Sequence, residues 1–294
     1  MIGVYDSGYG GLSVLRHLVE ALPEHDFVYL GDSGRAPYGG RDAHTLLDFA
    51  EQAVERLFEE GCGLVVVACN TVSCVCLRHL QQRYCGPGSG RRVLGVTIPG
   101  AELAVSIGAA RVGILATSRT VSSGTYVAEI HKLDPTVQVL QQAAPLLAGV
   151  VEEGWEDSEI AELCVRRYLD RMPPVEALLL GCTHYPYLAG ALGRARPGLR
   201  LLDPAPFLAR RLVEWLARHP GFVTAAEPPG RLRVLCTGDP QAFAEHGERF
   251  LGARVPPVEH VAEIDGRLAH ADPAHAPKGQ IVRPRRGSRW PGSS

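Results

Sequence analysis

Lysine is nearly absent from this chain. Its 294 residues include only Lys132 and Lys278, and the other basic residues are arginines. A Schiff-base enzyme, including one that uses pyridoxal phosphate, needs a lysine amine. Lys132 stands in the polar stretch AEIHKLDP and Lys278 in a Pro/Gly-rich tail, so neither is expected to be buried or poised for catalysis. The composition therefore argues against Schiff-base chemistry.

Long apolar runs and an excess of one charge are also missing, and no leader is expected. No apolar run reaches the ~18 residues of a membrane span, and MIGVYDSGYGG lacks the basic and apolar regions of a signal peptide. The formal net charge is −2, which does not favour nucleic acid or an anionic membrane as a partner. We expect a cytoplasmic protein whose eight cysteines stay reduced.

Short β-branched or leucine-rich runs alternate with amphipathic stretches along most of the chain. Several runs are continuously apolar, as expected of strands buried on both faces of a parallel sheet. The alternation predicts α/β architecture. The predicted strands are 2–5, 27–30, 64–68, 93–96, 112–116, 137–140, 177–181, 199–202 and 232–236, and the clearest helical patterns cover 10–22, 44–61, 160–172 and 206–219.

The chain contains an internal echo. GLVVVACNT ends in Cys69-Asn70-Thr71 and EALLLGCTH ends in Cys182-Thr183-His184, each at the end of a predicted buried strand. Ligands of open α/β sheets bind at the carboxyl ends of strands. The echo therefore predicts two similar domains that face one cleft. From about His270 the chain is rich in Pro, Gly, Ser and Arg, and we expect a disordered tail.

The segment 6–11, DSGYGG, follows the first predicted strand and opens a helix. It is not a P-loop, because no Gly-Lys-Ser/Thr follows, and Ser13 replaces the third glycine of a dinucleotide-binding turn. Two interpretations stay open. The backbone amides can hold a carboxylate-sized anion, or the segment is a tight turn capped by Asp6 or Ser7.

Two cysteines stand where chemistry is expected. A thiol at a strand end that opens a helix has its pKa lowered toward neutrality and can exchange protons, which applies to Cys69 and Cys182. Polar residues follow both, whereas the other six thiols are predicted to be structural: Cys62, Cys74, Cys76, Cys85, Cys164 and Cys236. The cysteine spacings contain no metal-binding pair, and no metal is expected.

These cysteines allow two chemical interpretations. A hydrolase with Cys182 and His184 leaves Cys69 unexplained, and no nucleophile elbow is present. Inversion at a carbon acid needs a base on one face and an acid on the other. Two domains that each present one cysteine supply this arrangement without lysine or cofactor.

The residues that carry a family resemblance occur in order along the chain: IGVYDSGYGGLSVL, YLGDSGRAPYG, VACNTVS, GVTIPGA, GILATSRTVSSGTY, LLLGCTHYPYL and LCTGDPQAF. Over residues 1–262 the chain resembles the glutamate racemase branch of the cofactor-independent aspartate/glutamate racemase superfamily. The CTH form of the second cysteine motif is similar to the glutamate branch. Departures include Ser33, where threonine is commoner, and Ala144 and Gly149 before the acidic pair 152–153.

The resemblance implies two flavodoxin-like α/β domains with mainly parallel sheets, related by pseudo-two-fold symmetry, with the active site in the cleft between them. The expected domains are 1–95 plus 205–265, with Cys69, and 96–204, with Cys182; the tail covers 270–294. It also implies cofactor-independent interconversion of L- and D-glutamate by α-proton transfer between two cysteines, a supply of D-glutamate for peptidoglycan, and a homodimer.

By motif position, Cys69 matches the base for D-glutamate and Cys182 the base for L-glutamate. Asp6 and His184 match residues that assist these cysteines. Asp32 and Glu152 match further carboxylates, and because Glu153 follows, the second assignment can shift by one. The positions that match substrate-holding residues are Asp6, Ser7, Tyr38, Gly39, Asn70, Thr71, Thr183 and His184, with Thr120 and Ser33 as further contacts.

Two rivals remain at this point. The same machinery can act on aspartate or another substrate that bears a carboxylate. Alternatively, the chain is a two-domain binding protein for an anionic ligand, with thiols that do no chemistry.

Overall fold

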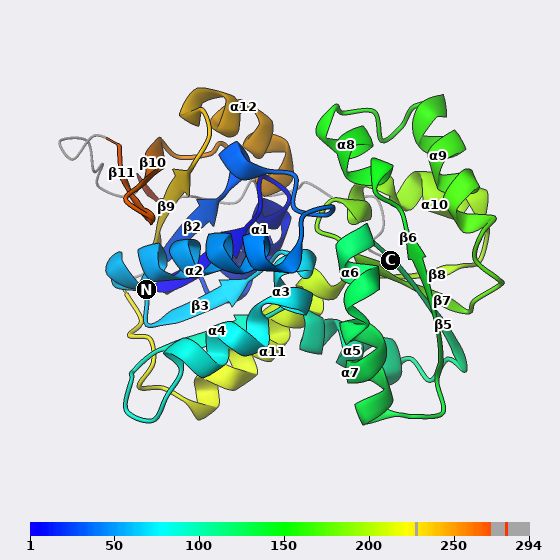
Figure 1. Cartoon of the computed structure of the whole chain (residues 1–294), viewed down its shortest axis with the longest axis horizontal. Coiled ribbons are helices and arrows are strands. Elements are labelled where there is room, and N and C mark those ends of the chain that lie inside the picture. Colours follow the sequence, from blue (N-terminus) through cyan, green and yellow to red (C-terminus); the bar gives the residue numbers. More distant parts are fainter. Residues whose placement is uncertain (227–228, 272–279, 282–294) are drawn as a thin grey trace.

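A computed structural model describes residues 1–226, 229–271 and 280–281, and their strands form two sheets (Figure 1). The first sheet has the order β11-β10-β9-β2-β1-β3-β4, and the second has the order β6-β5-β7-β8. The strands of the first are β1 (Ile2–Asp6), β2 (Phe27–Gly31), β3 (Leu64–Val67), β4 (Arg92–Gly95), β9 (Arg231–Cys236), β10 (Val258–Ile264), β11 (Arg267–His270) and β12 (Gln280–Ile281), which pairs with β9 outside this order. Those of the second are β5 (Arg111–Ala116), β6 (Gln138–Ala143), β7 (Ala177–Gly181) and β8 (Arg200–Leu202).

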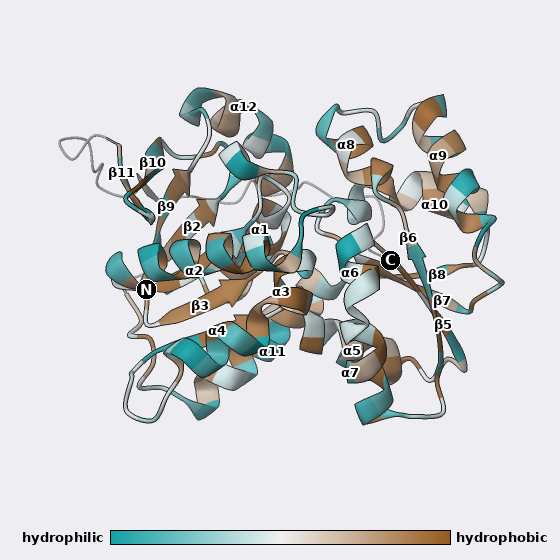
Figure 2. Ribbon diagram, in the orientation of Figure 1, coloured by the Kyte–Doolittle hydropathy of each residue, from teal (hydrophilic) through white to brown (hydrophobic). Residues whose placement is uncertain are grey.

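Helices follow most strands and cover the sheets. Several begin at a capping side chain; for example, Asp42 accepts the N–H of Thr45, and Asp203 accepts that of Ala205. In Figure 2 the inner strands are apolar, whereas the outer faces of the helices carry polar residues. The helices are α1 (Gly11–Ala21), α2 (Ala43–Glu59), α3 (Asn70–Val75), α4 (Leu77–Tyr84), α5 (Thr97–Ser106), α6 (Ser118–Ser123), α7 (Thr125–Leu133), α8 (Leu146–Glu152), α9 (Glu159–Leu169), α10 (Ala189–Ala195), α11 (Pro204–Arg218) and α12 (Pro240–Leu251), with 3₁₀ turns η1 (Ser33–Arg35) and η2 (Tyr185–Leu188).

The same strand order occurs twice. The first sheet contains β2-β1-β3-β4 and the second is β6-β5-β7-β8, all paired in parallel. Each set has four strands, and in both sets a cysteine follows the third strand in chain order: Cys69 follows β3, and Cys182 follows β7. The similarity between the two sequence segments therefore reflects a repeated strand order, and both thiols lie at the carboxyl edge of their sheet.

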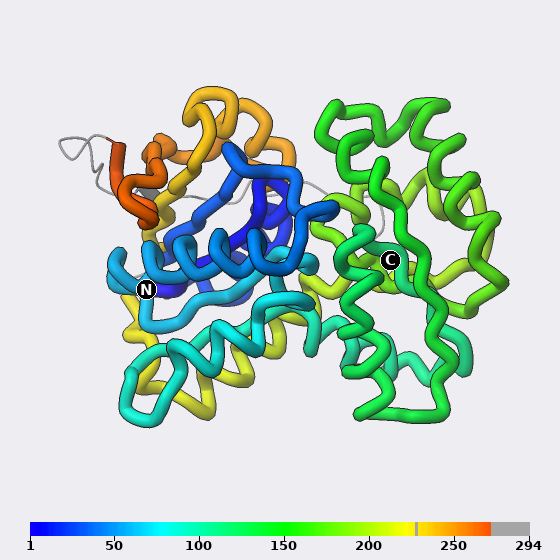
Figure 3. The backbone as a smooth tube through the Cα atoms, viewed as in Figure 1, coloured from blue at the N-terminus to red at the C-terminus, as the bar shows by residue number. Residues whose placement is uncertain are grey.

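The chain makes the second sheet between two parts of the first. In Figure 3 it passes from the blue and cyan part to the green part and returns in yellow and orange. Helix α11 contacts both α1 and α5 on the way back. The predicted domain boundaries stay a prediction.

All nine predicted strands and all four predicted helices are present. The hairpin β10–β11 was not predicted, although its turn residues Asp265 (φ 50°) and Gly266 (φ 77°) are a known hairpin signal. Of the expected tail, His270 ends β11, Ala271 donates its N–H to the carbonyl oxygen of His260, and Gln280–Ile281 pair with β9. The other tail residues lie outside the described residues. Lys132 is exposed and pairs with Glu129 at 2.8 Å; Lys278 also lies outside the described residues. Among the helices that are described, none is long and apolar enough to cross a membrane.

Candidate active site

The two strand-end thiols are nearly buried and close enough to influence each other. Cys69 is 6% exposed and Cys182 is 9% exposed. A charge on Cys182 contributes to the rise in the pKa of Cys69. The loops that carry them therefore meet at one site between the two sheets.

Cys182 is linked to an imidazole and a carboxylate. Its Sγ lies 3.7 Å from His184 Nδ1, and His184 Nε2 lies 3.0 Å from Glu152 Oε1. Burial lowers the pKa of His184, but hydrogen bonds with Cys182 and Glu152 outweigh it and raise this pKa to about 10. The ring is therefore a cation at neutral pH, with one N–H directed at each partner. Glu153 is exposed, so Glu152 is the carboxylate that reaches this site.

Cys69 has a different environment. Its Sγ donates to Ser7 Oγ at 3.6 Å, and among the described residues no histidine is hydrogen-bonded to it. Burial raises the pKa of Cys69, and the charge of Asp6 raises it further. The N–H of Val72, at the start of α3, lowers this pKa by less. The prediction that a helix start brings this thiol's pKa toward neutrality is therefore wrong for Cys69.

Asp6 is a buried carboxylate with one oxygen unsatisfied. Its Oδ1 accepts the N–H of Gly8 at 3.0 Å, and its Oδ2 has no hydrogen-bond partner among the described residues. Burial raises the pKa of Asp6 from 3.8 to about 6, although the charge of His184 lowers it. Of the two interpretations of segment 6–11, this geometry favours the tight turn, in which Asp6 itself accepts a backbone N–H.

The glycine-rich turn brings the two halves together. A Cβ on Gly10 would lie 2.4 Å from Thr183 Oγ1 and 2.7 Å from His184 Nδ1, so this approach requires glycine. Ser13 Oγ donates to the carbonyl oxygen of Thr183 at 3.4 Å. The Tyr29 hydroxyl donates to the carbonyl oxygen of Gly8 at 2.7 Å and so helps to fix the turn. The first and second motifs are therefore in direct contact.

A cluster of buried hydroxyls lies beside Cys69. Thr71 Oγ1 lies 2.9 Å from Thr117 Oγ1 and 3.3 Å from Thr120 Oγ1, and the last two are 3.0 Å apart. Thr71 belongs to the first sheet's half and the other two to the second. The sequence indicated Thr71 and Thr120 but missed Thr117, whose signal is its position as the N-cap of α6.

Asp32 organises a loop. It accepts hydrogen bonds from Arg35 Nε (2.9 and 2.8 Å), from Thr237 Oγ1 (2.6 Å) and from the hydroxyl of Tyr38. The Tyr38 hydroxyl also lies 2.9 Å from that of Tyr5. The side chain of Tyr38 thus points into the core of the first sheet, and its backbone is the part that can reach a ligand.

Gly39, next to Tyr38, contacts residues of the half that contains the second sheet. The carbonyl oxygen of Gly39 accepts the N–H of Arg119 at 2.9 Å. A Cβ on Gly39 would lie 2.9 Å from that of Thr117. Ser33 faces the other way, because its Oγ would lie 2.7 Å from a Cβ on Gly238. Gly39 therefore lies near the hydroxyl cluster, whereas Ser33 faces the segment that follows β9.

Residues outside the motifs complete the surroundings. The ring of Phe250, on α12, packs edge-on against His184 with centroids 5.5 Å apart, and Tyr126 donates to Asn70 Oδ1. Within the described ranges, no group of three or more His, Cys, Asp and Glu residues is arranged to hold a metal ion.

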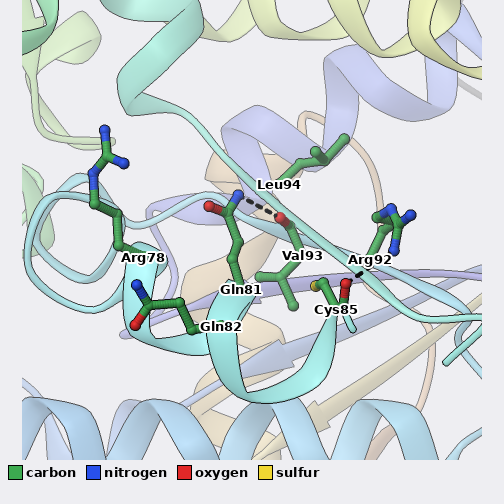
Figure 4. A pocket seen from close by; sticks show the side chains of 7 residues that line it. All are labelled: Arg78, Gln81, Gln82, Cys85, Arg92, Val93 and Leu94. Carbon is green, nitrogen blue, oxygen red and sulfur yellow. Dashed lines mark hydrogen bonds between the residues drawn. The ribbon is translucent and has the colours of Figure 1, made fainter. Parts of the chain in front are cut away.

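A separate surface hollow lies beside α4 and β4 (Figure 4). Gln81 Nε2 donates to the carbonyl oxygen of Val93 at 2.9 Å, and Arg92 Nη1 to that of Cys85 at 3.4 Å. Two of its polar side chains are thus already engaged, and it contains no residue predicted to be functional.

The arrangement offers two thiols with unlike neighbours, set among hydroxyl, amide and backbone N–H donors. Such a site can remove a proton from a carbon acid with one sulfur and return a proton with the other. The donors suit a substrate that bears carboxylates.

Comparison with known proteins agrees with this chemistry. Residues 2–212 match the family described as Asp/Glu/hydantoin racemase. A glutamate racemase of Thermus thermophilus is 41% identical over 262 residues, and that of Geobacter metallireducens is 37% identical over 265; each match covers 89% of this chain and 96% of the relative. The crystal structure of glutamate racemase from Francisella tularensis in complex with D-glutamate superposes with a TM-score of 0.81 at 31% identity, covering 89% of this chain and 97% of that one.

Proposed function

The chain belongs to the Asp/Glu/hydantoin racemase family, and on this basis we propose that it is an isomerase that interconverts L-glutamate and D-glutamate. The observation that carries the proposal is the pair of nearly buried thiols, Cys69 and Cys182, at equivalent strand ends of two sheets with the same strand order. The relatives named as glutamate racemases support glutamate as the substrate.

The surroundings of the thiols support an assignment of their roles. The His184 cation has its Nδ1 3.7 Å from the Cys182 sulfur, so its N–H can stabilise negative charge that this sulfur carries during the reaction. Burial and the charge of Asp6 keep Cys69 in the thiol form. Cys182 is thus placed to act as the base and Cys69 as the acid, which is the arrangement needed to receive L-glutamate.

In the L-to-D direction the Cys182 thiolate takes the α-proton. The electrons of the broken C–H bond pass to the α-carbon and its carboxylate, and the Cys69 thiol then gives its proton to the opposite face. The sulfur of Cys182 ends as a thiol and that of Cys69 as a thiolate. The reverse direction starts from this second state, and Asp6, beside Cys69, can accept or return a proton as the states interchange.

Holding the substrate falls to neutral donors. Asn70 and Thr71 follow Cys69 in the sequence, and Thr183 follows Cys182. Their amide and hydroxyl groups therefore lie close to the position that the α-carbon of the substrate must occupy between the thiols. Donors fixed around the α-carboxylate stabilise the charge that develops on it during proton removal. Both reacting groups are then held near one carbon atom, which makes proton transfer effectively intramolecular.

The proposal is tested by incubating the purified protein with L-glutamate in D₂O without pyridoxal phosphate. We expect deuterium at the α-carbon and formation of D-glutamate, and neither in Cys69→Ser or Cys182→Ser, which should still bind glutamate. Absence of both signals in the unaltered protein would contradict the proposal. Faster turnover of L-aspartate would redirect it to the aspartate substrate, and glutamate binding without exchange would favour a binding protein.

The cellular role follows from the same proposal. D-glutamate produced here would supply peptidoglycan synthesis, and we expect the reaction to take place in the cytoplasm. The direct test is depletion of the protein, which should make growth depend on added D-glutamate. Continued growth without it would contradict this role.

A homodimer is part of the proposal. The exposed apolar side chains of the α8–α9 patch, defined as Leu146, Trp155, Ile160 and Leu163, are 46–63% exposed and support an association surface. Sedimentation velocity should show a dimer that Leu163→Asp weakens. A monomer at all concentrations in the unaltered protein would exclude it.

A further inference from the structure

Tyr126, near the start of α7, has no exposed surface, and its hydroxyl lies 2.5 Å from Asn70 Oδ1. Asn70 is itself 2% exposed and begins α3, one residue after Cys69. Helix α7 follows β5 of the second sheet, whereas α3 follows β3 of the first. This hydrogen bond therefore joins the two halves immediately beside a reacting thiol.

We propose that Tyr126 is a positioning residue that fixes the orientation of the Asn70 carboxamide for a substrate carboxylate. The inference rests on the proposed function, since it assumes that Asn70 holds the substrate. A carboxamide has one accepting and one donating end. A hydroxyl that donates to Oδ1 makes Nδ2 the end that remains for a ligand, and only this end can donate to a carboxylate oxygen.

The chemistry of Tyr126 suits a permanent donor. Burial raises the pKa of Tyr126 well above its usual value, and charges on Cys74, Cys182 and Cys69 act in the same direction. The hydroxyl therefore keeps its proton through changes in the charge of either catalytic thiol. The Asn70 amide is thus held in one orientation during both halves of the reaction.

The position of the ring is fixed from behind by Gly100 of α5. A Cβ on Gly100 would lie 3.0 Å from Tyr126 Cε1 and 3.1 Å from its hydroxyl oxygen, so the ring packs directly on the glycine backbone. Helix α5 also contacts α7 along its length. A side chain at Gly100 would push the hydroxyl away from its present position, which provides a second way to disturb the contact.

Tyr126→Phe removes the hydroxyl and keeps the ring. Without the tyrosine the amide can turn over, and its oxygen would then face the carboxylate. We expect KM for L- and D-glutamate to rise about three- to tenfold, because the amide donor that binds the carboxylate is no longer held in place. Gly100→Ala, which keeps the hydroxyl but displaces it, should raise KM in the same way by a smaller factor.

A double-mutant cycle separates positioning from a general structural effect. In an Asn70→Ala background, Tyr126→Phe should cause no further rise in KM. The matched control is Tyr84→Phe: Tyr84 is also buried and donates to a side chain, Glu55, at 2.8 Å, but it lies at the end of α4. This control should lower thermal stability without changing KM.

The outcomes distinguish this inference from the proposed function. If the unaltered protein racemises glutamate and both Tyr126→Phe and Gly100→Ala leave KM unchanged, the inference is wrong and the function stands. Multiplicative effects in the double variant would also overturn it. If the unaltered protein shows no exchange, it is the proposed function that fails.

Discussion

Arg249 of α12 donates a hydrogen bond to the carbonyl oxygen of Val151 in α8, across the gap between helices that belong to different sheets. Its guanidinium also pairs with Glu156 at 3.3 Å. Val151 precedes Glu152, which holds His184, and Phe250 beside Arg249 packs on the same imidazole. One arginine therefore supports the residues behind Cys182 from the opposite half of the molecule.

Arg249→Met should weaken proton transfer at Cys182 and lower kcat/KM about five- to twentyfold, through a less constrained Glu152. The enantiomers have equal free energy in water, so kcat/KM must fall equally in both directions. Isotope effects can show which of the two proton transfers the substitution slows. The primary isotope effect should grow for α-deuterated L-glutamate, whose deuterium Cys182 removes, and shrink for the D-enantiomer.

The control for this variant is Arg210→Met. Arg210 is an exposed helix arginine stacked on Phe207 at 5.0 Å, the same distance as Arg249 to Phe250, but it lies on α11. Its kinetics should not change. Isotope effects that stay symmetric in Arg249→Met would show that this arginine does not act on the Cys182 side.

The pH dependence of kcat/KM should be bell-shaped. Ionised Asp6 and protonated His184 are both needed, so activity should fall below about pH 6, where Asp6 gains a proton, and above about pH 10, where His184 loses one. In His184→Gln the alkaline limb should no longer report the imidazole. The acidic limb should persist but move to higher pH, because the charge of His184 lowers the pKa of Asp6. Loss of the acidic limb in His184→Gln would show that this limb does not report Asp6.

Asp6→Asn should stabilise the protein while reducing its activity. Because the folded-state pKa of about 6 exceeds the unfolded value of 3.8, the folded state binds the proton more tightly, and stability is lost as pH rises through this window. The neutral amide avoids that loss and should add roughly 1–3 kcal/mol to the free energy of unfolding at pH 8. The gain should vanish near pH 4.

Chemical denaturation at both pH values measures this effect. Asp42→Asn is the comparison, because Asp42 is an exposed helix cap whose pKa is lowered by hydrogen bonds from Thr45. It should give no gain at pH 8. A similar gain in both variants would trace the effect to net charge and not to the burial of Asp6.

Thiol labelling should distinguish the two catalytic cysteines. At pH 7 an alkylating reagent should modify Cys182, beside the His184 cation, before Cys69, whose pKa burial raises. Bound glutamate should protect both. Peptide mapping measures the order, with half-buried Cys164 as a reference for simple accessibility. Initial labelling of Cys69 or Cys74 would contradict the roles proposed for the two thiols.

Much of the fold was predictable because parallel strands buried on both faces are continuous apolar runs. The same pattern located Cys69 and Cys182, because each stands between a continuous apolar run and polar residues, at the carboxyl end of a strand where ligands bind. The motif resemblance assigned neighbours such as His184 and Asp6, which the structure brings to the same site.

The rest depends on contacts between distant parts of the chain. Tyr126 and Asn70 are 56 residues apart, and Arg249 and Val151 are 98 apart, so no local pattern links either pair. The raised pKa of Cys69 depends in the same way on what packs over it. A helix start is visible in the sequence, whereas the burial that outweighs it is a property of the assembled fold.

The return of the chain to the first sheet has a consequence for biosynthesis. Strand β9 pairs with β2, and Thr237 just beyond it completes the bonding of Asp32, 205 residues earlier. A chain still on the ribosome can therefore possess every predicted catalytic residue while β2 has an unpaired edge and the Asp32 loop lacks one of its supports. A truncation before residue 231 would leave it in that condition permanently, so the synthesis of β9 decides when the enzyme can become competent.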